Sequence, residues 1–279
     1  MKLSIVIPVY NNERNLGPLY EDLKSKVLDV VDYECEIVMV DDGSKDDSWS
    51  ALQRLCGQDE RILAIHLSKN FGSHSAILCG LEHCTGDCAA VKSADLQEPS
   101  ELVIQMVDSW REGNNVVLAV RSEREDGASQ KTFANLYYWL TRKTALPNMP
   151  KEGFDAYLVD RKVIGVLSRL DNTNSAITGQ ILWSGFNTGV VEYVRKAREI
   201  GKSQWTLKKK LRLVSDTLFG FSTVPIKLVE VVGVLAFFGA LVWAVILLVS
   251  RLQGLIQVDG WTTLIIFSLF SFGVIMMTL

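Results

Sequence analysis

Asp95 is the acidic residue whose sequence surroundings point most directly to chemistry. It lies in the stretch SADLQEP (93–99), just after a short apolar run that ends at Val91. A carboxylate at the end of a buried strand can hold a divalent cation against a phosphate group, because Mg²⁺ and Mn²⁺ prefer oxygen ligands. We therefore predict that Asp95 binds Mg²⁺ or Mn²⁺ and faces the phosphates of a ligand.

Ser93 occupies the position where a second carboxylate would share this role. Residues i and i+2 of an extended segment point to the same side, so Ser93 and Asp95 should face the ligand while Ala94 packs inward. A diphosphate, Asp95 and waters can together supply the six or so oxygens that such an ion needs. The Ser93 hydroxyl could contact the ion, a water ligand or a phosphate oxygen. The competing hypothesis is that Ser93 marks lost catalysis and that Asp95 only caps the strand.

Three further polar motifs follow predicted strands, namely PVYNNE (8–13), VDDGSKDDS (40–48) and LSKNFGSHSA (67–76). Asp41 can accept a hydrogen bond from a base or a ribose hydroxyl. Backbone donors at Gly43 and Gly72 can approach a ligand closely because no Cβ obstructs them. Each motif alone is a common turn or helix start, but their order and spacing together indicate one nucleotide site.

These motifs are positioned by alternating strand and helix patterns. Such alternation predicts an α/β fold with a mostly parallel sheet and helices on both faces, whose ligands bind beyond the carboxyl ends of the strands. Strands are expected at 3–9, 36–40, 62–67, 89–91 and 116–120, and helices at 16–27, 48–55, 73–84, 101–112, 131–144 and 160–170. The segment 176–186 is expected to pack beneath the ligand cleft.

The C-terminal part has a membrane pattern. Residues 231–249 and 261–279 contain no charged residue, and each run is long enough for a helix that crosses a bilayer, so we predict two transmembrane helices. A buried hairpin of core helices is the alternative, but soluble helices usually keep a polar face. Residues 205–221 combine apolar and basic positions as in an interfacial helix. Basic residues before the first span place the N-terminal domain in the cytoplasm.

Composition excludes several other classes of protein. The net charge of −3 gives no support to nucleic-acid binding. Pro8 interrupts the first apolar run too early for a signal peptide. The five cysteines fit free thiols in a reducing compartment, and HCTGDC (83–88) lacks a second ligand pair for zinc.

In order and spacing, the motifs resemble those of family 2 glycosyltransferases with the GT-A fold. Within that family the chain is most similar to the polyprenyl-phosphate glycosyltransferases, the group that contains dolichol-phosphate mannose synthase and bacterial undecaprenyl-phosphate glycosyltransferases. The resemblance covers nearly the whole chain. It rests on the stretches SIVIPVYNNERNL (4–16), VDDGSKDDS (40–48), LSKNFGSHSAILCGL (67–81), SADLQEPSELV (93–103), VRSEREDGASQKTFANLYYWL (120–140), EGFDAYLVDRKVI (152–164) and the segment 181–216.

The resemblance implies a role for each matching residue. It implies that a nucleoside-diphosphate sugar is bound by Pro8, Tyr10, Glu13, Asp41, Gly43, Ser93, Asp95 and Gln97. It also implies that Arg121 and Lys131 reach the phosphate of a polyprenyl (undecaprenyl) phosphate acceptor. At Lys131 the family more often has arginine, and at Ala134 it often has serine, which removes one phosphate hydrogen bond.

The expected reaction is inverting sugar transfer at the membrane. A phosphate monoester is already anionic near neutral pH, so it can attack the anomeric carbon without a strong base, and the protein has to align and neutralise the phosphates. Asp155 could act as a catalytic base, or it could orient Arg121 or a sugar hydroxyl. The alternatives are transfer to another lipid such as diacylglycerol, whose hydroxyl needs a base, and a non-catalytic membrane protein that binds sugar nucleotides.

We expect three regions in the chain. They are a cytoplasmic GT-A domain (1–200), a juxtamembrane acceptor loop and interfacial helix (201–225), and a two-helix transmembrane segment (226–279) in the inner (plasma) membrane. A homo-oligomer is possible, and because the last apolar run has no polar tail, we expect that the full protein continues beyond Leu279. The sequence does not specify the nucleotide, the sugar or the lipid carrier.

Overall fold

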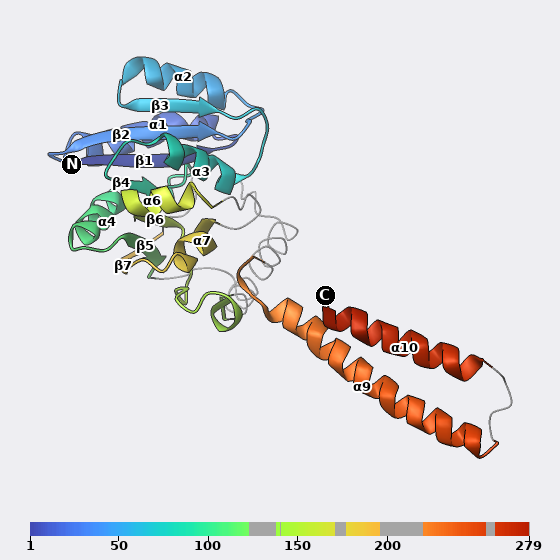
Figure 1. Ribbon diagram of the computed structural model, residues 1–279. Helices are drawn as coiled ribbons and strands as arrows, with labels where there is room; N and C mark the ends of the chain where they lie inside the picture. Colours follow the sequence, from blue (N-terminus) through green and yellow to red (C-terminus); the bar gives the residue numbers. More distant parts are fainter. Residues whose placement is uncertain (123–137, 140, 171–176, 196–219, 255–259, 279) are drawn as a thin grey trace. The chain divides into compact units, whose positions relative to one another are not determined.

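The computed structural model describes residues 1–122, 138–139, 141–170, 177–195, 220–254 and 260–278. The chain divides into two units, Met1–Gly220 and Phe221–Leu279. The first unit is an α/β domain and the second is a pair of helices (Figure 1).

The α/β domain is built on a seven-stranded sheet with the order β3-β2-β1-β4-β6-β5-β7. Its strands are β1 (Lys2–Val9), β2 (Glu34–Asp41), β3 (Ile62–His66), β4 (Cys88–Val91), β5 (Val116–Arg121), β6 (Ala156–Asp160) and β7 (Thr188–Tyr193). Neighbouring strands are parallel except at β6, which is antiparallel to both β4 and β5. The predicted mostly parallel sheet is therefore confirmed.

Helices cover both faces of this sheet. They are α1 (Glu13–Leu23), the π-helix η1 (Lys24–Leu28), α2 (Ser48–Gln58), α3 (Ser73–His83), α4 (Leu102–Arg111), α6 (Arg161–Leu167) and α7 (Ile177–Trp183). In Figure 1, α3 and α6 lie in front of the sheet and α1 lies behind it.

Successive side chains of a strand face opposite sides of the sheet, so each strand packs against helices on both sides. Leu3, Ile5 and Ile7 of β1 pack in one buried cluster with residues of α1, α2 and α4. The side chain of Val6, which alternates with them, faces α3. A Cβ on Gly80 of α3 would lie 2.4 Å from Val6 Cγ1, so a glycine at this position lets the helix lie directly on the sheet.

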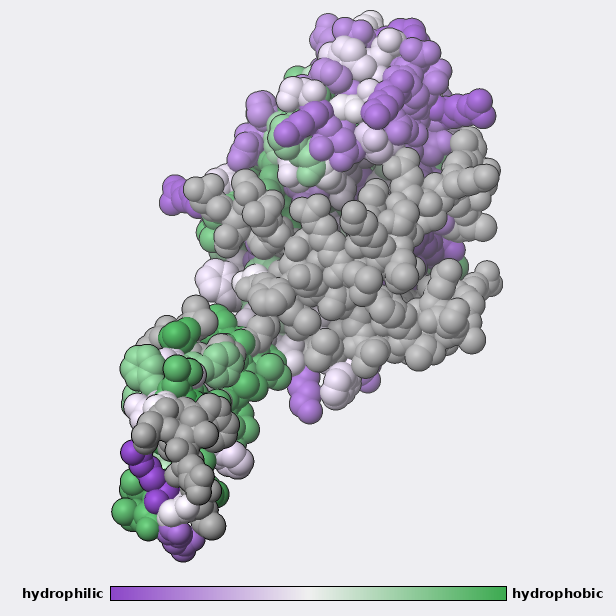
Figure 2. Space-filling view, turned by 90° about the vertical axis from the view of Figure 1, so that its right-hand side faces the viewer, coloured by the Kyte–Doolittle hydropathy of each residue, from purple (hydrophilic) through white to green (hydrophobic). Residues whose placement is uncertain are grey.

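The second unit consists of α9 (Val224–Leu252) and α10 (Trp261–Thr278), which pack against each other. Gly233, Ala240 and Leu247 of α9 are buried and recur every seven residues, while most other described side chains of this helix are exposed and apolar. Figure 2 shows the resulting large hydrophobic areas on this unit. Among the described residues, one helical stretch, Ile226–Leu252, is long and apolar enough to cross a membrane, whereas the apolar stretch Thr263–Ile275 is shorter. The two helices predicted to span the membrane thus form, but two spans are not confirmed.

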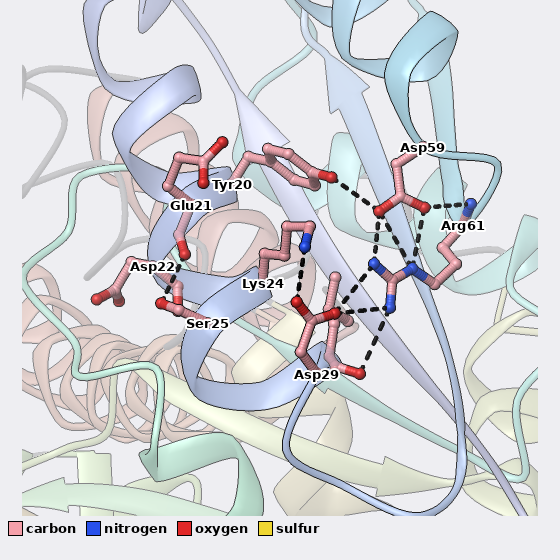
Figure 3. A network of polar contacts seen from close by, with 9 residues as sticks. Tyr20, Glu21, Asp22, Lys24, Ser25, Asp29, Asp59 and Arg61 are labelled. Atoms are coloured by element: carbon pink, nitrogen blue, oxygen red, sulfur yellow. Dashed lines mark hydrogen bonds and ion pairs between the residues drawn. The ribbon is translucent and has the colours of Figure 1, made fainter.

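A polar network ties α1 and η1 to the turn before β3 (Figure 3). Asp59 receives hydrogen bonds from Tyr20 Oη at 2.8 Å and from Arg61 Nη2 at 2.7 Å. Lys24 Nζ lies 2.6 Å from Asp29 Oδ2, and Arg61 also reaches Asp29 Oδ1 at 3.5 Å. The pairing with Arg61 holds the pKa of Asp59 well below its usual range. This network belongs to the scaffold.

Glu36 anchors the amino-terminal edge of the sheet. Its carboxylate accepts hydrogen bonds from Ser4 Oγ at 2.7 Å and Thr85 Oγ1 at 2.7 Å, and it pairs with Lys2 Nζ at 2.7 Å. Burial raises the pKa of Glu36, but the hydrogen bonds from Lys2, Thr85 and Ser4 outweigh burial and hold the pKa at about 2.

This carboxylate should contribute stability that depends on pH. Because the folded pKa is depressed, the contribution is present above the unfolded pKa of 4.5 and is lost as the pH falls toward about 2. We expect Glu36→Gln to lower the free energy of unfolding at pH 7 by about 2 kcal/mol after allowance for solvent screening, and by much less at pH 3. Urea unfolding of the detergent-solubilised protein at both pH values measures this, with Glu34→Gln on the exposed end of β2 as control. An equal loss at both pH values would contradict the assignment.

The predicted elements agree with the structure through β5. β6 and β7 are not among the predicted strands. β6 lies within the stretch 152–164, and β7 follows α7 after a short loop. Residues 141–144 are helical as predicted. Residues 205–219 of the predicted interfacial helix at 205–221, and most of the predicted helix at 131–144, lie outside the described residues, so both helices stay predictions.

Candidate active site

The loops after β1 and β2 form one structure at the carboxyl edge of the sheet. Asn11, whose φ is 52°, donates its backbone N–H to Ser44 Oγ at 2.9 Å and accepts from the Lys45 backbone N–H at 2.9 Å. The backbone N–H of Glu13 donates to Asp46 Oδ2 at 3.2 Å. These bonds hold PVYNNE against VDDGSKDDS. Pro8 and Tyr10 are half-buried here and Glu13 is exposed.

Asp41 is fully buried at the end of β2. Its Oδ2 lies 2.7 Å from Nδ1 of His66, and its Oδ1 accepts from the Ser44 backbone N–H at 3.2 Å. The exposed ring of His66 lies 4.9 Å from the ring of Trp49, with the two ring planes tilted by 37°. The sequence singled out Asp41 but missed His66, which β3 brings beside it in the register Asp41↔His66.

Gly43 has a scaffold function that the sequence did not show. Its φ is 65°, and a Cβ at this position would lie 2.5 Å from the carbonyl carbon of Lys69 and 2.8 Å from the backbone nitrogen of Asn70. The neighbouring Asp42 accepts from the backbone N–H of Phe71 at 2.7 Å and of Gly72 at 2.9 Å. The glycine therefore lets the second motif pack directly on the third.

Ser93 and Asp95 face each other after β4. The Ser93 hydroxyl lies 2.6 Å from Asp95 Oδ1 and 2.7 Å from Glu98 Oε2, and its backbone N–H donates to the same Glu98 oxygen at 2.9 Å. Ala94 is buried, as predicted. The segment is a turn, with Leu96 at a φ of 61°, instead of the extended chain that the alternation implied.

Glu98 is a buried carboxyl group behind this turn that the sequence reading did not assign. It is 2% exposed, and burial raises its pKa. The ammonium group of Lys92 donates to the Glu98 backbone carbonyl. The Ser93 hydroxyl bridges the carboxyl groups of Asp95 and Glu98.

Arg121 and Asp155 form an ion pair at the ends of β5 and β6. Arg121 Nε donates to Asp155 Oδ2, and Tyr193 Oη donates to the same oxygen at 3.0 Å. Burial lowers the pKa of Arg121, but the bond to Asp155 outweighs it and raises the pKa, so the guanidinium stays charged. Burial, followed by the charge of Asp155, raises the pKa of Tyr193.

Arg195 connects this pair to the Asp95 turn. Its Nη1 lies 3.8 Å from Asp155 Oδ2, and its Nη2 lies 3.9 Å from Asp95 Oδ2 and donates to Gln97 Oε1. The sequence analysis missed Arg195 because it missed β7: Arg195 comes two residues after Tyr193, the last residue of that strand, and both side chains contact Asp155.

The predicted residues thus fall into two groups at one edge of the sheet. Ser93, Asp95, Gln97, Arg121 and Asp155 are joined by direct contacts or through Arg195. A second group lies at the ends of β1 and β2 and in the segments that follow them, and consists of Pro8, Tyr10, Glu13, Asp41 and Gly43. Lys131 lies outside the described residues.

The oxygen donors near Asp95 suit a hard divalent cation only in part. In the part of the chain that the structure describes, no three acidic, histidine or cysteine side chains are grouped as for a metal site. The turn offers one carboxylate, the Ser93 hydroxyl and the Gln97 amide oxygen. These residues fit Mg²⁺ or Mn²⁺ when phosphate oxygens complete the coordination.

Solved structures with a similar fold are glycosyltransferases. Mannosyl-3-phosphoglycerate synthase from Rubrobacter xylanophilus aligns with a TM-score of 0.55 at 15% identity, over 78% of this chain and 72% of that chain. The mannosyltransferase PcManGT from Pyrobaculum calidifontis, solved in complex with GDP-Man and Mn²⁺, aligns with a TM-score of 0.51 at 17% identity, over 72% of this chain and 58% of that chain. At these identities the likeness concerns the fold.

Sequence relatives define the family. An uncharacterized glycosyltransferase of Bacillus subtilis, YkcC, is 36% identical over 281 residues, covering 100% of this chain and 86% of the relative. The bactoprenol glucosyl transferase of Shigella phage SfV is 31% identical over 275 residues, covering 98% of this chain and 89% of the relative. The family model for glycosyl transferase family 2 matches residues 4–168. The chain therefore belongs to glycosyl transferase family 2 and has the GT-A fold.

Proposed function

We propose that the protein transfers a sugar from a nucleoside-diphosphate sugar to a polyprenyl (undecaprenyl) phosphate, with inversion, at the cytoplasmic face of the inner (plasma) membrane. A relative that matches 98% of the chain is named a bactoprenol glucosyl transferase. The structural observation that carries the proposal is the meeting of Asp95 and the Arg121–Asp155 pair at one edge of the sheet, joined through Arg195. On this proposal, the arginine that binds the acceptor phosphate, Arg121, lies beside the donor site.

On the donor side, the loops after β1 and β2 would hold the nucleotide, with Pro8, Tyr10, Glu13, Asp41 and Gly43 on its borders. Ser93, Asp95 and Gln97 would face the diphosphate. Mg²⁺ or Mn²⁺, when bound, would neutralise the charge that develops on the leaving diphosphate. The Mn²⁺ in the PcManGT complex supports a divalent ion of this kind.

On the acceptor side, Arg121 would bind the lipid phosphate. Asp155 and Tyr193 fix the guanidinium by its Nε side, which leaves its two terminal amino groups to form the planar fork that suits phosphate oxygens. Lys131 would add a second positive charge. The acceptor oxygen then attacks the anomeric carbon while the diphosphate leaves on the opposite face, so the configuration inverts.

The contacts of Asp155 favour a phosphate acceptor over a neutral lipid hydroxyl. Its Oδ2 receives bonds from Arg121 and Tyr193 and also faces Arg195. These donors engage the oxygen that would have to accept a proton, whereas a diacylglycerol hydroxyl needs proton removal. A phosphate monoester needs alignment and charge neutralisation, which two arginines supply.

The membrane part of the proposal rests on α9 and α10. The span Ile226–Leu252 supports anchoring, and α10 would form the second crossing of a multi-pass protein. The regions 201–225 and 226–279 would bring the acceptor to the domain 1–200. We further propose that the interfacial helix at 205–221 and the basic residues around it gather anionic lipid, and that the helical pair supports a homo-oligomer.

A panel of nucleotide sugars tests the reaction. Membranes that contain the protein would be incubated with undecaprenyl phosphate and each UDP- or GDP-linked hexose, and the lipids analysed by mass spectrometry. We expect one donor to give a monophosphate-linked glycolipid that mild acid cleaves. Tight binding of a sugar nucleotide with no lipid product from any donor would favour the non-catalytic hypothesis.

A further inference from the structure

The guanidinium group of Arg195 lies next to the side-chain oxygens that a divalent ion would use as ligands. Its Nη2 donates to Gln97 Oε1 and lies 3.9 Å from Asp95 Oδ2. These are the side chains after β4 that the proposed function assigns to the metal and the donor diphosphate. Its Nη1 lies 3.8 Å from Asp155 Oδ2, so one rigid fork faces both carboxylates of the site.

A metal ion and this guanidinium compete for Asp95. Mg²⁺ binds carboxylate oxygens at about 2.1 Å, so an ion on Asp95 would lie beside a positive charge that is already paired with the same group. The turn places one carboxylate, Asp95, beside this guanidinium, because residue 93 is serine. One carboxylate cannot neutralise both cations.

We propose that Arg195 is a built-in counter-ion that keeps the metal off Asp95 until a nucleoside diphosphate binds. A diphosphate gives the guanidinium a new anionic partner at the same place and adds phosphate oxygens to the coordination of the ion. Arg195 Nε, which is buried without a hydrogen-bond partner among the described residues, is a further donor for such an anion. Metal and diphosphate binding are then coupled, each strengthening the other.

This inference rests on the proposed donor chemistry. It predicts that loss of the Arg195 charge increases the affinity for Mn²⁺. In Arg195→Gln, Mn²⁺ alone should bind roughly tenfold more tightly than in the wild type, because coupling between two sites commonly changes an affinity by about 5- to 150-fold. UDP or GDP should enhance the Mn²⁺ affinity of this variant less than that of the wild type. The electron paramagnetic resonance signal of free Mn²⁺ measures both quantities on the full chain in detergent. Arg195→Lys, which keeps the charge, should stay near the wild type.

Three controls separate this role from a general effect. Arg54→Gln removes an exposed arginine from α2 and should leave Mn²⁺ binding unchanged. Adding Asp95→Asn to Arg195→Gln should abolish the gain, because the freed ligand is Asp95. If Arg195→Gln does not fold, Arg195→Met takes its place in the experiment.

The two arms of the experiment have separate meanings. Equal Mn²⁺ affinity of the wild type and Arg195→Gln, in the absence of nucleotide, would overturn the counter-ion role. Failure of UDP and GDP to bind any variant in the presence of Mn²⁺ would count against the proposed donor instead, while the measurement with metal alone would still decide the role of Arg195.

Discussion

Asp95→Asn should reduce sugar transfer at least about a thousandfold, to the limit of detection. The amide keeps the size of the side chain and its acceptor for the Ser93 hydroxyl, but it removes the carboxylate charge at the centre of the proposed donor site. Loss of a group that neutralises charge in the transition state commonly costs two to three orders of magnitude, and here the loss of metal adds to it. Turnover of a labelled sugar nucleotide into lipid measures the effect.

Ser93→Asp is the matched change at the neighbouring position. It restores a second carboxylate beside Asp95, so we expect an active enzyme that needs a lower metal concentration for half-maximal rate. The new carboxylate also replaces the hydrogen bond between the Ser93 hydroxyl and Glu98 with a contact between two carboxyl groups. This change should lower the melting temperature. Full wild-type turnover in excess chelator, or indifference to Asp95→Asn, would refute the metal assignment.

Arg121→Ala should lower turnover about a hundredfold while donor affinity stays nearly unchanged. The alanine removes the positioned donors for the acceptor phosphate, and Asp155 retains Tyr193 and Arg195 as partners. Initial rates at varied donor and acceptor concentrations separate the two effects. The loss should appear in kcat and in the KM for the lipid.

Tyr193→Phe serves as the control for this prediction. It removes one hydrogen bond to Asp155 and leaves the Arg121–Asp155 pair. We therefore expect turnover to fall about tenfold or less, which corresponds to the net free energy of one hydrogen bond. If the donor affinity of Arg121→Ala falls as much as its turnover, Arg121 belongs to the nucleotide pocket and the acceptor site has to be placed elsewhere.

The sequence predicted the first half of the fold well because each motif there follows its own strand. Asp41 and Asp95 directly follow short β-branched or apolar runs, and parallel strands with helical crossovers put such ends at one edge. The local pattern also predicted that Ala94 packs inward, and this residue is buried. Asp155 contacts Arg121, and its role stays a prediction.

The remaining contacts depend on pairings between distant segments. His66 meets Asp41 through the β2–β3 register. Arg195 meets Asp95 although β6 and β5 lie between β7 and β4 in the sheet. No local pattern specifies these pairings. The left-handed turn at Leu96 likewise arises from the packing of the segment after β4, which brings Glu98 under Ser93.

The choice of acceptor tests the central claim most directly. The purified protein, with the donor that the nucleotide-sugar panel identifies and with Mg²⁺ or Mn²⁺, would be given undecaprenyl phosphate, undecaprenol or diacylglycerol, and the lipids would be analysed by mass spectrometry. The proposed function predicts a sugar linked through phosphate from undecaprenyl phosphate, no product from the two neutral lipids, and no product from Asp95→Asn with any acceptor. Glycosylation of undecaprenol or diacylglycerol at a rate comparable to that of the phosphate would contradict it.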